Sequence, residues 1–276
     1  MKFISQASIT KSLLKEYNLF AKKRFGQNFI IDPSVVIKIA ENCGTSKDTT
    51  VIEVGPGLGA LSEQLALRSK EVIAYEIDND LVEILKETIK DYDVEVIHQD
   101  FLEADLDLIK DKEPLVVCAN VPYNITTPIL FKLIESNLNY SQITLMVQKE
   151  VALRLNAKVS TKEYNALSIM IQYLFKTEIL SVVPKNCFYP VPKVDSMVIS
   201  LYPRHQNLVK DQSAFFAFLR QCFGQRRKTL HNNLKTFLDV NELSNLKEKS
   251  IFDLSRRPES LQLHEFIELY QSIYEN

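Results

Sequence analysis

The chain of 276 residues lacks most features that mark metal-binding, disulfide-rich or membrane proteins. Its four cysteines are scattered without a CxxC pair, so neither structural zinc nor disulfides are expected. The four histidines show no metal-ligand spacing, and we expect no metal site. The longest apolar runs are far too short to cross a bilayer, and the N-terminus does not resemble a secretory signal. These absences favour a cytoplasmic enzyme.

Acidic residues slightly outnumber basic ones, and the net charge of −2 by itself argues against a nucleic-acid partner. The distribution of the charges argues otherwise, because basic residues gather near both ends of the chain. One group is Lys22, Lys23 and Arg24, and the other is Arg226, Arg227 and Lys228. We predict that both groups hold phosphates of a nucleic-acid backbone. The alternative is that they are ordinary solvated faces.

Short apolar runs alternate with helical patterns from about residue 50 onward. Strands are predicted at residues 50–54, 72–77, 94–98, 115–119, 143–147, 178–183 and 196–202. Helical periodicity alone follows, at residues 213–223, 229–238, 242–249 and 263–274. The pattern predicts an α/β fold with a seven-stranded, doubly wound, Rossmann-like sheet and a small C-terminal all-helical domain. We place an amphipathic or mobile N-terminal arm at 1–21, the sheet domain at 22–203 and the helical domain at 204–276.

A glycine-rich turn follows the first predicted strand of the sheet. Gly55 and Gly57 lie in the segment VIEVGPGLGA, and Glu76 ends the next predicted strand 21 residues after Gly55. A carboxylate at that position can accept hydrogen bonds from both hydroxyls of a ribose. Asp100 ends the third strand, where it suits the amine of a bound adenine, with backbone groups of Phe101 completing the pocket.

The same turn also fits the dinucleotide pattern, so an NAD-dependent dehydrogenase is an alternative. Two features favour S-adenosylmethionine instead. The glycines alternate and follow Glu53, an arrangement typical of S-adenosylmethionine sites, and acidic residues end both following strands.

Asn120, Val121, Pro122 and Tyr123 form a tetrad at the end of the fourth predicted strand. The Asn side-chain oxygen can accept one N–H of an exocyclic amine, and a backbone carbonyl can accept the other. Pro122 confines Val121 to extended geometry, which fixes the direction of the Val121 carbonyl. The Tyr123 ring offers a face on which a base can stack. The tetrad therefore predicts methylation of an adenine amine without a general base, although a simple turn would use similar residues.

Residues 24–30, with the sequence RFGQNFI, precede the first strand of the sheet. Their backbone groups could close over the methionine end of the cofactor. They could equally form a turn that caps a helix starting near Asp32 and Pro33.

Together these segments resemble one family, the ribosomal RNA adenine N6,N6-dimethyltransferases, and within it the bacterial small-subunit branch known from kasugamycin sensitivity. The resemblance covers about residues 22–266. It rests on KKRFGQNFIID, EVGPGLGALSEQL, NVPYNITTPIL, MVQKEVALRL, FYPVPKVDS and FGQRRKTLHNNLK.

The resemblance implies a role for individual positions. It assigns contacts with S-adenosylmethionine to Asn28, Ile30, Gly55, Gly57, Glu76, Asp100, Phe101 and Asn120. It assigns the target amine and its base to Asn120, Val121, Pro122 and Tyr123. Phe188, which opens the FxPxP segment, would close the opposite face of the target base, unless it is a buried core aromatic.

The implied activity is dimethylation of N6 on two adjacent adenosines in the 3′-terminal hairpin loop of 16S rRNA, during small-subunit biogenesis and by a monomer. One alternative is the antibiotic-resistance type, which methylates adenine in large-subunit (23S) rRNA. Another is a relative that only binds nucleic acid. The intact tetrad and glycine turn favour an enzyme, and the QKEVALRL and QRRKTL segments favour the small-subunit branch.

Overall fold

A computed structural model describes residues 3–22, 25–123, 125–136, 138–248 and 252–275. The chain divides by its contacts into two compact units. One unit comprises Met1–Ala152 with Glu178–Tyr202, and the other comprises Leu153–Thr177 with Pro203–Asn276. The arm, sheet domain and helical domain that we delimited from sequence stay predictions. By contacts, Leu153–Thr177 group with the C-terminal residues.

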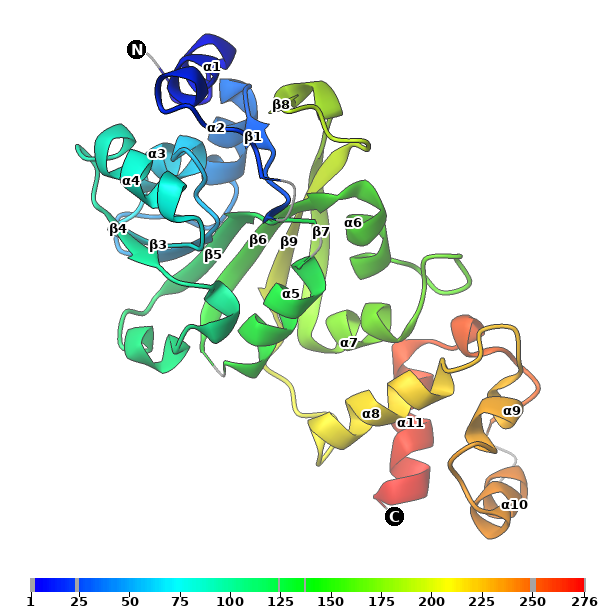
Figure 1. Ribbon diagram of the computed structural model, residues 1–276. Helices are drawn as coiled ribbons and strands as arrows, with labels where there is room; N and C mark the ends of the chain where they lie inside the picture. Colours follow the sequence, from blue (N-terminus) through cyan, green and yellow to red (C-terminus); the bar gives the residue numbers. More distant parts are fainter. Residues whose placement is uncertain (1–2, 23–24, 124, 137, 249–251, 276) are drawn as a thin grey trace. The chain divides into compact units, whose positions relative to one another are not determined.

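The first unit is built on a seven-stranded sheet in the order β4-β3-β2-β5-β6-β9-β7 (Figure 1). Neighbouring strands from β4 to β6 are parallel, whereas β9 runs antiparallel to β6. The predicted fold class is confirmed, and each predicted strand lies in this sheet. Their bounds are β2 Thr50–Val54, β3 Glu71–Glu76, β4 Val94–His98, β5 Leu115–Asn120, β6 Tyr140–Gln148, β7 Phe175–Val183 and β9 Ser196–Pro203.

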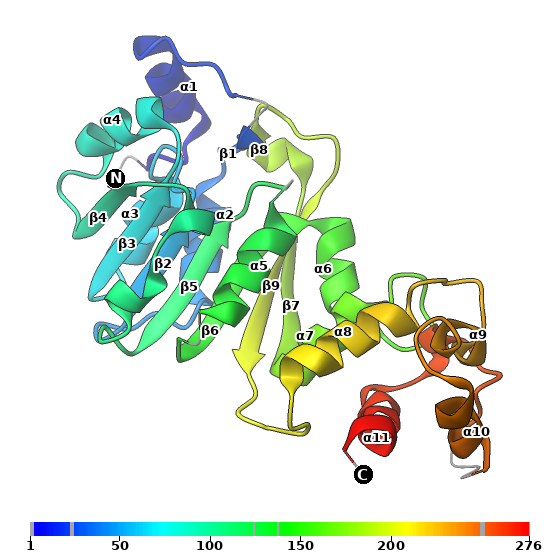
Figure 2. The same cartoon turned by 60° about the horizontal axis from the view of Figure 1, so that its bottom comes forward.

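Helices cover both faces of the sheet, which explains why its central strands are apolar along their whole length. Helices α2 (Pro33–Glu41) and α3 (Ala60–Ala66) lie on one face, and α5 (Thr126–Glu135) lies on the other (Figures 1 and 2). In β5, Val116 and Cys118 belong to the core cluster beneath α2 and α3, whereas Val117, equally buried, points to the opposite face. Helix α4 (Asn79–Thr88) follows β3, and helix α6 (Lys149–Leu155) follows β6.

A second, two-stranded sheet pairs segments that are far apart in the sequence. Strand β1 (Phe29–Ile30) runs antiparallel to β8 (Phe188–Tyr189), with Phe29 opposite Tyr189 and Ile30 opposite Phe188. Strands of two residues leave no periodicity in the sequence, so this pairing was not predicted. It joins the RFGQNFI segment to the FxPxP segment.

The N-terminal residues contain an amphipathic helix, α1 (Ala7–Glu16), which buries Thr10 and Leu14. Leu14 and the preceding Ile4 belong to a core cluster with Leu58 and Leu81. The backbone N–H of Ile4 also donates to the buried carboxylate of Glu63 at 3.3 Å. The start of the chain is therefore packed against the glycine turn and α4.

The second unit is mainly helical in its described residues. It contains α7 (Ala166–Leu174), α8 (Gln212–Cys222), α9 (Leu230–Leu234), α10 (Val240–Glu248) and α11 (Leu263–Tyr274). Its core is aromatic, with the rings of Phe215 and Phe218 packed against Tyr270 at centroid distances of 5.2 and 5.6 Å. The four C-terminal helices predicted from sequence are confirmed, and α9 is shorter than expected. No helix in the described part of the chain is long and apolar enough to span a membrane.

Candidate active site

A cavity of about 320 Å³ opens where the carboxyl ends of β2, β3, β4 and β5 meet. This is the point where the strand order reverses, the usual ligand site of an open α/β sheet. Every predicted cofactor residue and the whole tetrad line it, namely Asn28, Ile30, Gly55, Gly57, Glu76, Asp100, Phe101, Asn120, Val121, Pro122 and Tyr123. Sequence positions as far apart as 28 and 123 are thus brought to one site.

The turn after β2 depends on glycine. Gly55 and Gly57 have φ angles of +72° and +63°. This backbone conformation is strained for any residue with a Cβ atom. A Cβ on Gly57 would meet the ring of Phe29 at 3.4 Å, so the loop containing Phe29 packs directly on the turn. The backbone N–H of Gly57 donates to Glu76 Oε2 at 3.2 Å.

Glu76 ends β3 and is almost fully buried. Its Oε1 accepts from the backbone N–H of Asp78 at 2.9 Å, while Oε2 accepts from Gly57. Burial raises the pKa of Glu76, although these backbone hydrogen bonds oppose the shift. The carboxylate is thus held in one orientation at the wall of the cavity, and its contact with a ribose stays a prediction.

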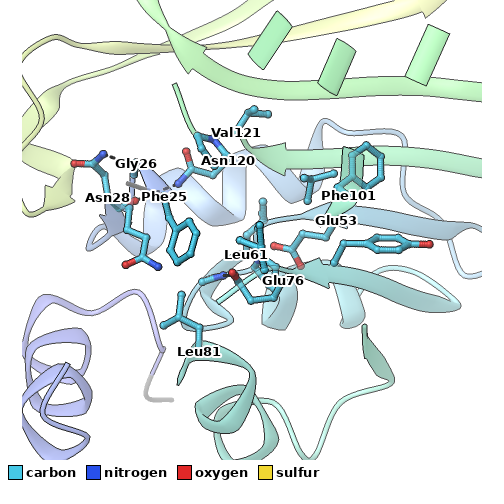
Figure 3. A pocket seen from close by; sticks show the side chains of 18 of the residues that line it. Phe25, Gly26, Asn28, Glu53, Leu61, Glu76, Leu81, Phe101, Asn120 and Val121 are labelled. Atoms are coloured by element: carbon cyan, nitrogen blue, oxygen red, sulfur yellow. Dashed lines mark hydrogen bonds between the residues drawn. The ribbon is translucent and has the colours of Figure 1, made fainter. Parts of the chain in front are cut away.

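A second buried acid, Glu53 of β2, also lines the cavity (Figure 3). Burial raises the pKa of Glu53 to about 8, and the neighbouring Glu76 adds to the shift. Within the described residues, Glu53 Oε2 has no hydrogen-bond partner. The unpartnered Glu53 oxygen, the acceptor oxygens of Glu76 and the close backbone approach at the glycine turn suit a ligand that carries N–H and O–H donors, so the site fits S-adenosylmethionine.

Asp100 and Phe101 form the far wall of the cavity, at the end of β4. Asp100 caps the short helix η2 (Phe101–Glu103), and its Oδ1 accepts from the backbone N–H of Leu102 at 2.9 Å. The buried ring of Phe101 meets Tyr75 edge to face, with centroids 5.3 Å apart. One carboxylate oxygen of Asp100 is thus used locally, and the residue still lines the cavity.

The amide of Asn120 is oriented by the loop of residues 25–30. Asn120 Nδ2 donates to the backbone carbonyl of Asn28 at 3.3 Å (Figure 3). Because the nitrogen end of the amide is used in this way, the oxygen end is the one left to accept an N–H.

The rest of the tetrad is fixed by neighbouring strands. The backbone N–H of Val121 donates to Met146 of β6 at 3.1 Å, and the Pro122 carbonyl accepts from the N–H of Ile125 at 3.2 Å. Among the described residues, no hydrogen bond reaches the Val121 carbonyl. Tyr123 is half-buried, and its hydroxyl shares a hydrogen bond of 2.8 Å with the buried Ser196 of β9.

Phe188 lies elsewhere. Its side chain is fully buried in the core cluster with Val36, Ile39 and Met146, and it is not among the residues that line the cavity. The structure thus places it as the core aromatic that was the alternative reading. A role for Phe188 in closing over the target base stays a prediction.

The predicted RNA-contacting residues have different surroundings. Arg226, Arg227 and Lys228 are exposed in the helical unit, and Arg226 donates to the carbonyl of Lys162 at 2.5 Å. The ammonium of Lys22 lies 2.6 Å from a carboxylate oxygen of both Asp78 and Asp80, and these contacts raise its pKa. Lys23 and Arg24 lie outside the described residues.

Three residues of this region were missed at the sequence level. Gln27 and Thr10 line the cavity, and Asp78 bonds the side chains of Lys22 and Gln27. Asp78 carries a recognisable signal, because Asp before a helical pattern is a favoured N-cap. Its second task, binding the loop, depends on residues more than 50 positions away and leaves no local pattern. In the described residues, no group of three or more His, Cys, Asp or Glu could hold a metal ion.

Comparison with known proteins shows one consistent likeness. A family model described as "Ribosomal RNA adenine dimethylase" matches residues 18–274. The chain is similar to proteins named "Ribosomal RNA small subunit methyltransferase A". It is 45% identical to that of Bacillus licheniformis, over 96% of each chain. It is 43% identical to that of Enterococcus faecalis, over 100% of this chain and 98% of the relative.

Solved structures agree with this. A dimethyladenosine transferase from Plasmodium falciparum matches with a TM-score of 0.77 at 26% identity, over 89% of this chain and 97% of that one. The 23S rRNA methyltransferase ErmE matches with a TM-score of 0.68 at 25% identity, over 89% and 99%.

Proposed function

The chain belongs to the ribosomal RNA adenine dimethylase family, and we propose that it dimethylates N6 of two adjacent adenosines in the 3′-terminal hairpin loop of 16S rRNA. It is a methyltransferase that uses S-adenosylmethionine on ribosomal RNA. The choice of the small subunit is supported by the names of relatives that match almost its full length. We further propose that it acts as a cytoplasmic monomer.

The cofactor would be held by the residues at the strand ends. Glu76 would accept from the ribose hydroxyls, and Asp100 with Phe101 would enclose the adenine. Gly55, Gly57, Asn28 and Ile30 line the cavity with close backbone approaches, which suits the methionine end. When bound, S-adenosylmethionine supplies a methyl group on a positively charged sulfur, an electrophile reactive enough to need no general base.

The target amine would be held by Asn120 and Val121. The oriented oxygen of Asn120 would accept one N–H, and the Val121 carbonyl would accept the other. Two acceptors placed this way draw the N–H bonds aside and leave the nitrogen lone pair facing the methyl donor. Tyr123, tethered through Ser196, would stack on the unstacked base. The amide orientation of Asn120 is the observation that carries the proposal.

Arg226, Arg227 and Lys228 would bind RNA phosphates, since they are exposed and lie together in one segment. Such contacts position the RNA without reading its sequence. The tetrad would thus carry out the reaction, and the helical unit would bind the RNA.

The test is transfer of labelled methyl groups from S-adenosylmethionine to unmethylated ribosomal subunits. We expect label on small subunits only, mapped by primer extension to two neighbouring adenosines in the 3′-terminal hairpin. Label confined to large subunits would instead favour the 23S type, which the likeness to ErmE keeps as a second candidate. A chain without transfer whose melting temperature also ignores S-adenosylmethionine would be a binding-only relative.

A further inference from the structure

One loop reaches from the cofactor side of the cavity to the tetrad. All residues 25–30 line the cavity, and Figure 3 shows Phe25 and Asn28 at its border near Asn120. The C-terminal end of this loop is fixed by pairing of β1 with β8 and by the N–H of Ile31, which donates to the Cys187 carbonyl at 2.8 Å. The other end of the loop is held mainly by contacts of side chains.

The contacts there converge on Asp78. Lys22 Nζ donates to Asp78 Oδ1 at 2.6 Å, and Gln27 Nε2 donates to Oδ2 at 2.7 Å. The ring is closed because the Lys22 backbone N–H donates to Gln27 Oε1, also at 2.7 Å. We call Lys22, Gln27 and Asp78 the Asp78 anchor. Both oxygens of one carboxylate are thus used to hold the beginning of the loop.

Asp78 is itself rigidly placed. It is 3% exposed, it caps α4 by accepting from the N–H of Asp80 at 3.2 Å, and its own N–H donates to Glu76. Burial alone would raise the pKa of Asp78, but the hydrogen bonds from Lys22 and Gln27 outweigh it and lower the pKa. The carboxylate therefore stays charged, and a buried charge without its cation is strongly unfavourable. Loss of the Lys22 contact should therefore cost more free energy than loss of an exposed ion pair.

The anchored loop leads to the reacting amide. Asn28 follows Gln27 directly, and its carbonyl accepts from Asn120 Nδ2. A displaced loop would free the Asn120 amide to rotate and present its nitrogen instead of its oxygen. The backbone N–H of Asp78 also donates to Glu76, so one residue connects the ribose side and the amine side of the cavity.

We infer that Asp78, with Lys22 and Gln27, is a positioning group that holds loop 25–30 so that Asn28 orients Asn120. This inference rests on the proposed function, and it gives Lys22 a role inside the enzyme in place of a phosphate contact.

The test compares Lys22→Met, Lys22→Arg, Asp78→Asn and the double variant Lys22→Met/Asp78→Asn. Lys86→Met serves as the matched control, because Lys86 makes an equally short but exposed ion pair with Glu83 on α4, at 2.6 Å. Three quantities are measured for each folded variant. They are S-adenosylmethionine affinity by calorimetry without RNA, hydrogen exchange of residues 25–31, and the salt dependence of RNA binding.

We expect Lys22→Met to weaken cofactor affinity about tenfold, the scale of one charge-assisted hydrogen bond. Exchange of residues 25–31 should accelerate, and the RNA salt slope should equal that of the parent. Lys22→Arg should recover most of the affinity, and the double variant should lose no more than Asp78→Asn alone. Lys86→Met should behave as the parent.

Two results would overturn the inference. One is parent cofactor affinity and exchange in Lys22→Met with a salt slope reduced by about one contact, which would make Lys22 a phosphate ligand. The other is parent behaviour in all three measurements. Failure of the proposed function can be told apart from these results, because the parent protein would then transfer no methyl group to small subunits.

Discussion

The cavity of the sheet unit and the basic segment of the helical unit differ in how their polar groups are held. In the cavity, Glu76 and Asn120 each have fixed partners, and Glu76 is almost fully buried. In the helical unit, Arg227 and Lys228 are exposed. The difference shows that aiming a weak nucleophile needs preorganised groups, whereas gripping a phosphate backbone needs only accessible charge. Substitutions should therefore have large, specific effects at the first place and graded, salt-dependent effects at the second.

The largest effect is expected from Asn120→Ala. Removal of the acceptor that orients the amine should lower kcat by about 100-fold or more. The melting temperature should stay near that of the parent, because Asn120 is only partly buried at the end of β5. Single-turnover transfer assays with parallel thermal melts check both. Turnover at the parent rate would remove the tetrad from the mechanism.

Glu76→Ala should come next. Loss of a carboxylate that can accept two hydroxyl hydrogen bonds should weaken S-adenosylmethionine binding about 10- to 100-fold. Glu76→Gln keeps one acceptor oxygen and should give an intermediate affinity. Isothermal titration in the absence of RNA measures each variant, and a parent affinity for the alanine variant would reject the ribose role.

A pH effect should follow from Glu53, whose pKa is raised to about 8 by burial. The folded state then binds a proton that the unfolded state has released, so stability falls as pH rises from the ordinary glutamate value toward 8. Glu53→Gln removes this loss. Its unfolding free energy should exceed that of the parent by on the order of 1 to 3 kcal/mol at pH 8, with no advantage near pH 4.

Urea titrations of both proteins at pH 4, 6 and 8 measure this difference. A gap between Glu53→Gln and the parent that is independent of pH would show that folding leaves the pKa of Glu53 at its ordinary value.

The smallest and most graded effect is expected from Arg226→Ala with Arg227→Ala. RNA affinity should fall, and the slope of log affinity against log salt should decrease by about two. Cofactor affinity should not change. The paired control is Lys86→Ala with Lys90→Ala, which removes the same charge from exposed positions on and just beyond α4. Equal slopes for both double variants would show that the arginines only face solvent.

The sequence predicted the sheet and the cofactor side of the cavity because both leave local marks. Strands buried on both faces are continuous apolar runs, and the turn at Gly55 and Gly57 needs positive φ angles that favour one residue type. Glu76, Asp100 and Asn120 could then be placed together, since parallel strand ends meet at one edge.

The remaining features depend on contacts between distant segments. The β1–β8 pairing, the contact of Asn120 with Asn28 and the Asp78 anchor join residues whose local sequence shows only a loop or a helix cap. Phe188 illustrates the same limit, because an aromatic residue beside a proline-rich segment suits a base-binding wall and a core equally well. Its burial beneath α2 emerges only from the packing.

The proposed mechanism requires the Asn120 amide to present its oxygen to the target amine while its nitrogen stays on the Asn28 carbonyl. A crystal structure with S-adenosylhomocysteine and an RNA hairpin that carries the target adenosine would show both contacts. We expect N6 within hydrogen-bond distance of Asn120 Oδ1 and of the Val121 carbonyl. An adenine bound with N6 away from both acceptors would contradict it.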